Sequence, residues 1–286
     1  MAMEMKRLMC SMLLIHLAAA DPESLTVWSD CGNSSIYEYR NDSEFQSNLN
    51  KVLESLVRNV YPTGSNTSIV GQNNNSTVYG LVQCRADLDS SDCKQCATTA
   101  KANLVQGCHN TSGYIQLDGC FLRYDNHNFY NDIESRQVTP TSILCNTSNS
   151  SQPQQFTNDV KTLLSNLINK AAQSPKLFAA DSGATSSNST ENIYSSAQCW
   201  RDLSRTSCGS CLTFALQSIN SCQTGALGAH FGSQNCYLRY EIYEFFNASV
   251  LSPPPGEIPP LSSGYLLSLR NIWVFGFQRV SFISVN

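Results

Sequence analysis

The sequence is poor in charge, and the charge that it has is not basic. Only 14% of its 286 residues are charged, with 18 Lys and Arg against 22 Asp and Glu, for a formal net charge of −4. Proteins that bind nucleic acid or anionic lipid carry clusters of positive side chains. We therefore exclude both as main partners.

A long uninterrupted apolar run is also absent near the C-terminus. The apolar stretch after residue 264 is broken by Arg270 and Arg279, which leaves no run of 18 residues that could span a bilayer. It follows the Pro-rich segment LSPPPGEIPP, which is typical of an extended linker. We expect residues 248–286 to be a linker and disordered tail, and we expect no membrane attachment in this form of the chain.

The one compact apolar run lies at the N-terminus. Lys6 and Arg7 precede the apolar segment Leu8 to Leu17, and Ala18, Ala19 and Ala20 follow it. This order is typical of a secretory signal peptide over residues 1–20. Its cleavage would remove Glu4, Lys6 and Arg7 and leave 16 basic and 21 acidic side chains, a net charge of −5. We expect a secreted protein of the extracellular space or apoplast.

Glycosylation sequons are frequent, which agrees with that compartment. The ten N-x-[ST] asparagines are Asn33, Asn41, Asn66, Asn74, Asn75, Asn110, Asn146, Asn149, Asn188 and Asn247. Asn74 and Asn75 overlap, so we expect a glycan on only one of them and take Asn75.

Cysteine is abundant and regularly placed. Of 13 cysteines, Cys10 would leave with the signal peptide. The first six of the remaining twelve recur as the second six at offsets of 114 to 116 residues. These cysteines are Cys31, Cys84, Cys93, Cys96, Cys108 and Cys120, then Cys145, Cys199, Cys208, Cys211, Cys222 and Cys236.

The residues between the cysteines repeat as well. VQCRADLDSSDCKQC aligns with AQCWRDLSRTSCGSC, and GCFLRYDNHNFYN aligns with NCYLRYEIYEFFN. The chain is therefore an internal duplication of two homologous domains, over residues 27–131 and 142–247. We place the boundary in the polar segment Asp132 to Ser142.

The sequence pattern of each repeat predicts an α+β domain. A helix is indicated by an apolar stripe, which comprises Phe45, Leu49, Val52, Leu53, Leu56 and Val60 in the first repeat and Phe156, Val160, Leu163, Leu164, Leu167 and Ala171 in the second. A second helix is expected to begin near Asp92 and near Ser207. STVYGLVQC and GYIQLDGCFLRYD alternate like strands without long helical crossovers, which favours an antiparallel sheet.

The C-x-x-C motif within each repeat allows three interpretations. A zinc site needs a second pair of ligands, and each repeat has only one such pair. A redox pair usually has no other cysteine within reach. Structural disulfides fit a secreted six-cysteine domain best, and no metal or cofactor is then expected. Six cysteines allow fifteen connectivities, although two sulfurs one helical turn apart are better placed for different partners.

These motifs resemble the plant cysteine-rich repeat family, also called the salt-stress response/antifungal domain, whose single-domain member is ginkbilobin. The resemblance rests on C-x8-C-x2-C, VYGLVQCRADL, IQLDGCFLRYD and CYLRYEIYEFFN, and covers roughly Val27 to Asn247. It implies a five-stranded antiparallel sheet with two helices in each domain. It also implies the disulfides Cys31–Cys108, Cys84–Cys93, Cys96–Cys120, Cys145–Cys222, Cys199–Cys208 and Cys211–Cys236.

Tandem members of this family are secretory proteins, plasmodesmata-located proteins or ectodomains of receptor-like kinases. The second repeat is most similar to a receptor-kinase ectodomain, yet no Gly-rich phosphate loop, H-R-D or D-F-G follows it. A truncated or spliced receptor-like product is therefore expected, with the plasma membrane as the alternative location.

Catalytic patterns are weak. His109, His127 and His230 do not occupy equivalent positions in the two repeats, which excludes a duplicated histidine-based active site. Asp125 and Glu241 would form a glycosidase pair only if they faced each other about 5–10 Å apart, and nothing in their spacing requires this. We expect no enzyme.

The ginkbilobin-like mannose site implies one candidate binding site. Its Asn, Arg and Glu correspond to Asn146, His230 and Glu241 in the second repeat, and to Gly32, Tyr114 and Asp125 in the first. His230 replaces the Arg with fewer donors and a charge that depends on pH, and a glycan on Asn146 would block the site.

Two functional hypotheses remain. The first is a non-enzymatic extracellular interaction module in plant stress or defence signalling, which contacts a protein or cell-wall glycan and associates with itself or with related receptors. The second is a secreted mannose-binding antifungal lectin.

Overall fold

In the computed structural model, residues 26–32, 39, 43–72, 76–131, 142–186 and 192–251 are described. The expected signal peptide, most of the boundary segment and nearly all of the expected tail lie outside these ranges. No helix in the described ranges is long and apolar enough to cross a membrane.

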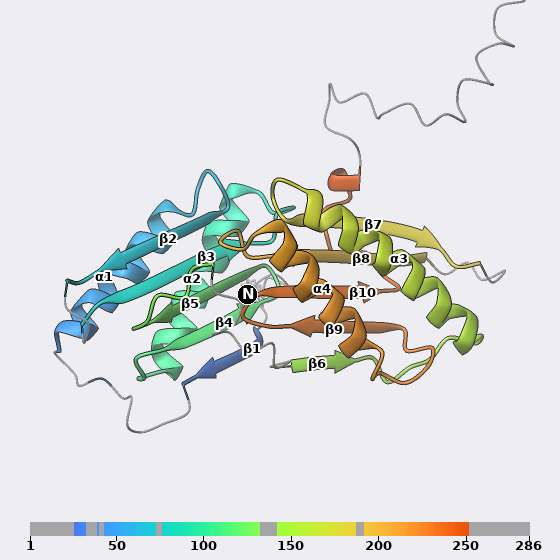
Figure 1. Ribbon diagram of the computed structural model, residues 1–286, viewed down its shortest axis with the longest axis horizontal. Helices are drawn as coiled ribbons and strands as arrows, with labels where there is room; N and C mark the ends of the chain where they lie inside the picture. Colours follow the sequence, from blue (N-terminus) through green and yellow to red (C-terminus); the bar gives the residue numbers. More distant parts are fainter. Residues whose placement is uncertain are drawn as a thin grey trace, which may run out of the picture. The chain divides into compact units, whose positions relative to one another are not determined.

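The first repeat forms one antiparallel sheet of five strands with two helices (Figure 1). Its elements are β1 (Thr26–Cys31), α1 (Glu44–Asn59), β2 (Ser65–Val70), β3 (Val78–Cys84), α2 (Ser90–Gly107), β4 (Gly113–Leu117) and β5 (Cys120–Asp125). The strand order is β1-β4-β5-β3-β2.

The second repeat has the same topology. Its elements are β6 (Ser142–Cys145), α3 (Pro153–Gln173), β7 (Phe178–Ala184), β8 (Asn192–Cys199), α4 (Arg205–Ile219), β9 (Gly228–Gly232) and β10 (Cys236–Glu241), followed by the short 3₁₀ helix η3 (Ala248–Leu251). The strand order β6-β9-β10-β8-β7 matches that of the first sheet element by element. The predicted fold class of two tandem α+β domains is confirmed.

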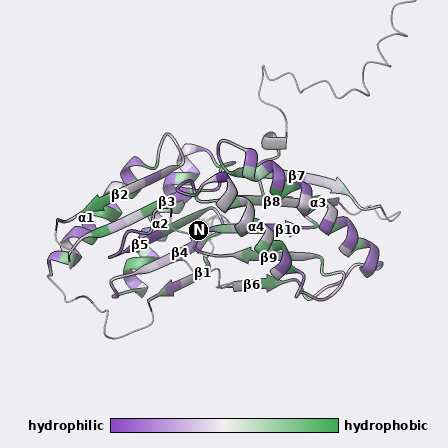
Figure 2. Ribbon diagram, in the orientation of Figure 1, coloured by the Kyte–Doolittle hydropathy of each residue, from purple (hydrophilic) through white to green (hydrophobic). Residues whose placement is uncertain are grey.

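The first helix of each repeat packs its apolar stripe on the sheet. Phe45 and Leu49 of α1 are buried, and so are Phe156 and Leu164 of α3. Leu163, which we expected in the second stripe, is only partly buried. Figure 2 shows apolar residues along the strands that these helices cover, as expected for two-layer packing.

The second helix of each repeat begins two residues before the position that its sequence indicates, at Ser90 and at Arg205. The N-cap residues are Asp89 and Ser204, not residues next to Asp92 and Ser207. The carboxylate of Asp89 accepts hydrogen bonds from the backbone N–H groups of Ser91 and Asp92, and this cap fixes where the helix begins. Cys93 and Cys96 therefore lie in successive turns of α2.

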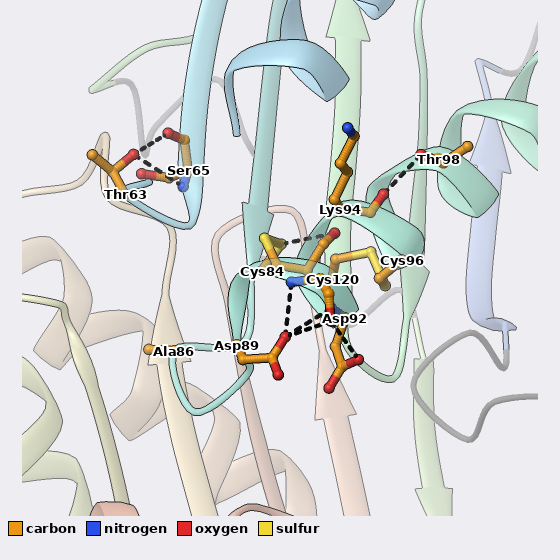
Figure 3. The surroundings of a disulfide bond; sticks show 12 residues. Thr63, Ser65, Cys84, Ala86, Asp89, Asp92, Lys94, Cys96, Thr98 and Cys120 are labelled. Carbon is orange, nitrogen blue, oxygen red and sulfur yellow. Dashed lines mark hydrogen bonds between the residues drawn. A yellow bond between two sulfur atoms is a disulfide. The ribbon is translucent and has the colours of Figure 1, made fainter. Parts of the chain in front are cut away.

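Six disulfides join these layers. They link Cys31–Cys108, Cys84–Cys93, Cys96–Cys120, Cys145–Cys222, Cys199–Cys208 and Cys211–Cys236, the same pairs that the family resemblance implies. In Figure 3, Cys96 on α2 reaches Cys120 at the start of β5. The two cysteines of each C-x-x-C thus belong to different bridges.

The faces of the two sheets that carry no helices also contribute to a buried layer. Trp28, Leu81 and Phe121 of the first repeat form one apolar cluster with Trp200 and Tyr237 of the second. The rings of Phe121 and Trp200 stack with centroids 4.4 Å apart and an interplanar angle of 9°. Both repeats fall in one compact unit, so this aromatic junction is a third core beside the two domain cores.

Gln83 and Gln198 occupy equivalent positions in the two repeats, and the side chain of each forms hydrogen bonds to the backbone of the other repeat. The Gln83 amide donates to the Cys199 carbonyl and accepts from the Arg201 N–H, at 3.1 and 2.7 Å. The Gln198 amide donates to the Cys84 carbonyl and accepts from the Ala86 N–H, at 2.9 and 3.0 Å. Each interaction occurs twice with the repeats exchanged, as in an interface with two-fold symmetry.

Candidate functional site

A cleft of about 960 Å³ lies at the junction and is lined by both repeats. We call it the junction cleft. The first repeat contributes Arg85, Asp87 and Asp118, and the second contributes Leu144, Asn146, His230, Arg239, Glu241 and Tyr243. Its volume lies at the upper end of the range for small-molecule sites, roughly 300–1,000 Å³.

Asp118 connects the charges of the two repeats at the base of the cleft. Its carboxylate accepts from Arg239 Nη1 at 2.7 Å and from Arg85 Nη1 at 3.2 Å. Arg85 also forms a two-pronged pair with Asp87, at 2.7 and 3.1 Å. Burial lowers the pKa of Arg85, but the bonds to Asp87 and the field of Asp118 outweigh it and raise the pKa overall. These arginines are therefore charged and already paired.

Glu241 is paired within its own strand. Arg239 Nε donates to Glu241 Oε1 at 3.1 Å, and the guanidinium of Arg239 lies over the ring of Phe245. Burial raises the pKa of Glu241 overall, although Arg239 and Tyr243 act in the opposite direction. The carboxylate is thus fixed in position and partly neutralised by its neighbours.

His230 lines the cleft as a neutral aromatic side chain. It is 7% exposed, and its ring packs edge-on against Trp28 and Tyr237. Burial, reinforced by Arg239 and Arg85, lowers its pKa to about 3. The expectation that its charge would follow pH is therefore wrong for the neutral and mildly acidic range, because the folded state keeps the imidazole neutral.

Asn146 lies at the edge of the cleft and already uses part of its amide. Its Oδ1 accepts from the Ser148 N–H at 2.9 Å, and its backbone N–H donates to the Gly228 carbonyl at 2.8 Å. The structure thus brings Asn146, His230 and Glu241 to one cleft. Within the part of the chain that is described, neither the amide nitrogen of Asn146 nor Nε2 of His230 has a hydrogen-bond partner.

Within its described residues, the first repeat has no comparable site. Tyr114, which aligns with His230, is 3% exposed within the aromatic junction. Asp125, which aligns with Glu241, pairs with Arg123 at 2.8 Å and does not line the junction cleft. Asp125 and Glu241 each face an arginine of their own strand, an arrangement that fixes both carboxylates structurally.

The other histidines lie apart from the cleft. His127 is largely exposed next to Asp125, and His109 stacks on Tyr39. All twelve cysteines of the repeats are in disulfides, so none of them offers a thiolate. In the described ranges, no three His, Cys, Asp or Glu side chains gather in a way that could hold a metal ion.

The sequons differ in accessibility. Asn149 and Asn247 are exposed, and Asn66 is half-buried on β2. Asn110 is buried, and its amide nitrogen donates to the carbonyls of Cys31 and Gly32, so a glycan there would have to displace these bonds. Asn33, Asn41, Asn74, Asn75 and Asn188 lie outside the described residues.

Sequence reasoning missed several residues of the cleft. Arg85, Asp118 and Arg239 follow no catalytic motif. Arg85 pairs with Asp118 within the first repeat, and Arg239 joins them from the second. Leu144 and Tyr243 are 48% and 52% exposed at the cleft, which an apolar strand pattern does not predict. The one available signal is the acidic and aromatic character of CYLRYEIYEFFN.

The chain matches the family model described as salt stress response/antifungal at residues 30–127 and 144–243. It is 35% identical to cysteine-rich repeat secretory protein 38 of Arabidopsis thaliana, across 72% of this chain and 81% of that protein. It is 33% identical to an antimicrobial ginkbilobin-2-like protein of Castanea crenata, across 73% of this chain and 85% of that protein.

A receptor-like kinase and the ectodomain of a receptor-like protein are also similar to this chain. The chain is 34% identical to cysteine-rich receptor-like protein kinase 7 of Arabidopsis thaliana over 86% of its own length, but it spans 37% of that kinase. The crystal structure of the tandem ectodomain of PDLP8, an Arabidopsis thaliana cysteine-rich receptor-like protein, matches with a TM-score of 0.66 at 26% identity, over 76% of this chain and 98% of that one. Secretory relatives and six disulfides agree with the extracellular location predicted from the sequence.

Proposed function

Because this chain belongs to the salt stress response/antifungal family, with one copy of the domain in each repeat, we propose that it is a non-enzymatic recognition protein in plant stress or defence signalling. It acts outside the cell, and its partner is another extracellular protein that binds in the junction cleft.

The character of the junction cleft carries this proposal. Leu144 and Tyr243 expose apolar surface at a concave site, beside the charged groups of Asp118, Arg239 and Glu241. Partly exposed aromatic and aliphatic anchors with a charged surround are typical of protein interfaces. Because the charges are already paired and fixed, they supply specificity more than new binding energy.

The chemistry of the cleft gives no support to catalysis. A general acid or base must be able to exchange a proton near the working pH. His230 is neutral and buried, and Glu241 is tied to Arg239. The proposal therefore assigns binding and not turnover.

A mannose-binding lectin is the second candidate, because Asn146, His230 and Glu241 line the same cleft. Two observations weaken it. The neutral His230 cannot supply the charged donors that an arginine would offer. The Asn146 oxygen already accepts a hydrogen bond from Ser148, which leaves less of its amide for a sugar.

Binding experiments on the glycosylated, disulfide-intact chain separate the two functions. The immobilised chain should retain a defined set of proteins from extracellular fluid, and the Leu144→Ala/Tyr243→Ala variant should lose them. Tyr61→Ala is a matched control, because Tyr61 is 60% exposed and does not line the cleft.

A mannan array completes the test. We expect the wild-type chain to bind mannan no better than the Asn146→Ala variant does. Strong mannan binding that Asn146→Ala abolishes would overturn the protein-recognition proposal in favour of the lectin.

A further inference from the structure

A second pocket, of about 420 Å³, lies across the junction and is separate in its lining from the junction cleft. Ser65, Asn66 and Thr67 of β2 and Tyr130 line it from the first repeat, and Arg201 and Asp202 line it from the second. We call it the Arg201 pocket. It requires both repeats, so a single-domain relative could not form it in this way.

Arg201 differs from the other arginines of the junction. Arg85, Arg123 and Arg239 each pair with a carboxylate. Arg201 makes no ion pair with any carboxylate in the described ranges, and its one side-chain hydrogen bond there is from Nη1 to Ser65 Oγ at 3.2 Å. Its Nε is buried without a hydrogen-bond partner in the same ranges. Burial lowers the pKa of Arg201, the direction expected for a cation with too little compensation.

The fold does not need a guanidinium at this position. In the first repeat the equivalent residue is Ala86, and both backbone N–H groups make the same bond to a glutamine of the other repeat. Burial of the Arg201 side chain thus costs desolvation free energy, while the hydrogen bond to Gln83 needs only the backbone N–H of this residue. A half-buried guanidinium with unused donors is suited to a carboxylate ligand, which it can bind through two parallel hydrogen bonds.

The other groups of the pocket narrow the ligand class. Asp202 would repel a compact anion such as sulfate, but its carboxylate can accept hydrogen bonds from hydroxyl groups. Ser65 and Thr67 add hydroxyls on one face of β2. From this combination we infer that the Arg201 pocket binds an acidic sugar, a hexuronate whose carboxylate meets Arg201 and whose hydroxyls meet Asp202. This site is additional to the protein-binding cleft proposed above.

Calorimetry with the galacturonic acid trimer as probe tests the inference. All proteins carry Ser68→Ala, which removes the sequon at Asn66 and so keeps a glycan away from the pocket rim. Arg201→Ala should weaken trimer binding by about 10- to 100-fold, since charge-assisted hydrogen bonds are lost. Arg205→Ala is the matched control, because it removes the same charge at an exposed position next to the pocket segment.

The outcomes are decisive in each arm. Trimer binding that Arg201→Ala weakens and Arg205→Ala leaves unchanged supports the inference. No measurable trimer binding, equal binding of a neutral galactose trimer, or equally effective competition by inorganic sulfate would each overturn it. Ala86 at the equivalent position indicates that Arg201→Ala folds, and its unfolding transition checks this directly.

The test is independent of the proposed function of the junction cleft. The Leu144→Ala/Tyr243→Ala variant should bind the galacturonic acid trimer like the wild-type chain. If that variant lost trimer binding, the acidic sugar would belong to the junction cleft and the Arg201 pocket would be excluded as its site.

Discussion

At the scale of single residues, Gln83 and Gln198 fix how the two sheets meet. Gln83 is 1% exposed and Gln198 is fully buried, and each amide uses both its carbonyl oxygen and its nitrogen across the junction. A buried polar group that loses its partner costs more free energy than its hydrogen bond contributes when the group is paired. These bonds therefore penalise any other arrangement of the two repeats.

Replacing one glutamine should be clearly destabilising. Gln198→Leu removes two hydrogen bonds and leaves the Cys84 carbonyl and the Ala86 N–H without these partners. We expect the free energy of unfolding in urea to fall by about 2–4 kcal/mol.

The control for this substitution is Gln223→Leu. Gln223 also donates to a backbone carbonyl, that of Thr147, but it does so at the surface. It should cost less than about 1 kcal/mol, because water can replace the lost bond. Equal losses in the two variants would contradict the assigned role of Gln198.

His230 should make the fold sensitive to acid. Its pKa is about 3 in the folded state and near 6.5 in the unfolded chain, so only the unfolded chain binds this proton between those values. The stabilisation is complete above pH 6.5 and is lost as pH falls toward 3, by at most about 1.4 kcal/mol per pH unit.

The measurement compares unfolding free energies of the wild type and His230→Phe across this pH range. The variant keeps a ring between Trp28 and Tyr237 but has no proton to bind. We expect the difference between the two proteins to shift in favour of the variant as the pH is lowered. A difference that is constant with pH would show that His230 titrates normally.

At the scale of elements, the disulfides tie each second helix to the strands that it covers. Cys96–Cys120 joins α2 to β5, and Cys84–Cys93 joins the end of β3 to the same helix. The two bridges differ mainly in the chain that they enclose, with sequence separations of 24 and 9 residues. The chain-entropy model ties disulfide stabilisation to that length.

The longer bridge should therefore contribute more to stability. The Cys96→Ala/Cys120→Ala variant should lose about 1 kcal/mol more in unfolding free energy than the Cys84→Ala/Cys93→Ala variant. Peptide mapping without reduction should find the other five bridges unchanged in each protein. A larger loss from the shorter bridge would show that local packing, and not loop closure, sets their contributions.

At the scale of the whole molecule, the aromatic junction couples the two repeats. Trp200 and Phe121 are 1% and 0% exposed, and each comes from a different repeat. Neither domain can bury this surface alone. We therefore expect the two repeats to unfold in one cooperative calorimetric transition.

Trp200→Ala should uncouple the repeats. Truncating a buried tryptophan costs about 3–5 kcal/mol, and here the loss falls on the contact between domains. We expect two separate transitions in the variant. Phe156→Ala is the control, because it truncates a buried ring within the core of the second repeat alone. If Phe156→Ala split the transition and Trp200→Ala did not, the coupling would not come through this layer.

The sequence predicted the fold of each repeat far better than the contact between the repeats. Cysteine offsets and the stripe of Phe45 and Leu49 determine what each repeat buries on its own, and both patterns are local. Gln83 and Gln198 occupy positions that look like the solvent face of an alternating strand. Only the identical placement of a glutamine before a cysteine in both repeats hints at their exchange.

The candidate cleft could be predicted only in part. Alignment with a single-domain relative pointed to Asn146, His230 and Glu241, and all three line the cleft. Asp118 and Arg85 could not be found in this way, since they reach the cleft from the first repeat and a single-domain relative has only one repeat. Burial also changed the chemistry of His230, which composition and spacing do not report.

The reciprocal glutamine bonds resemble those of a two-fold dimer interface, but they join two repeats of one polypeptide. In a true homodimer, every residue would have to serve both sides of the axis. Two repeats of one polypeptide are free of this constraint, so equivalent positions can carry different residues. Ala86 is equivalent to Arg201. Arg85, which lies near Tyr237, is equivalent to Trp200, which stacks on Phe121. The two dissimilar repeats are parts of one chain. They are therefore present in a one-to-one ratio at any protein concentration, and they cannot exchange as separate subunits do.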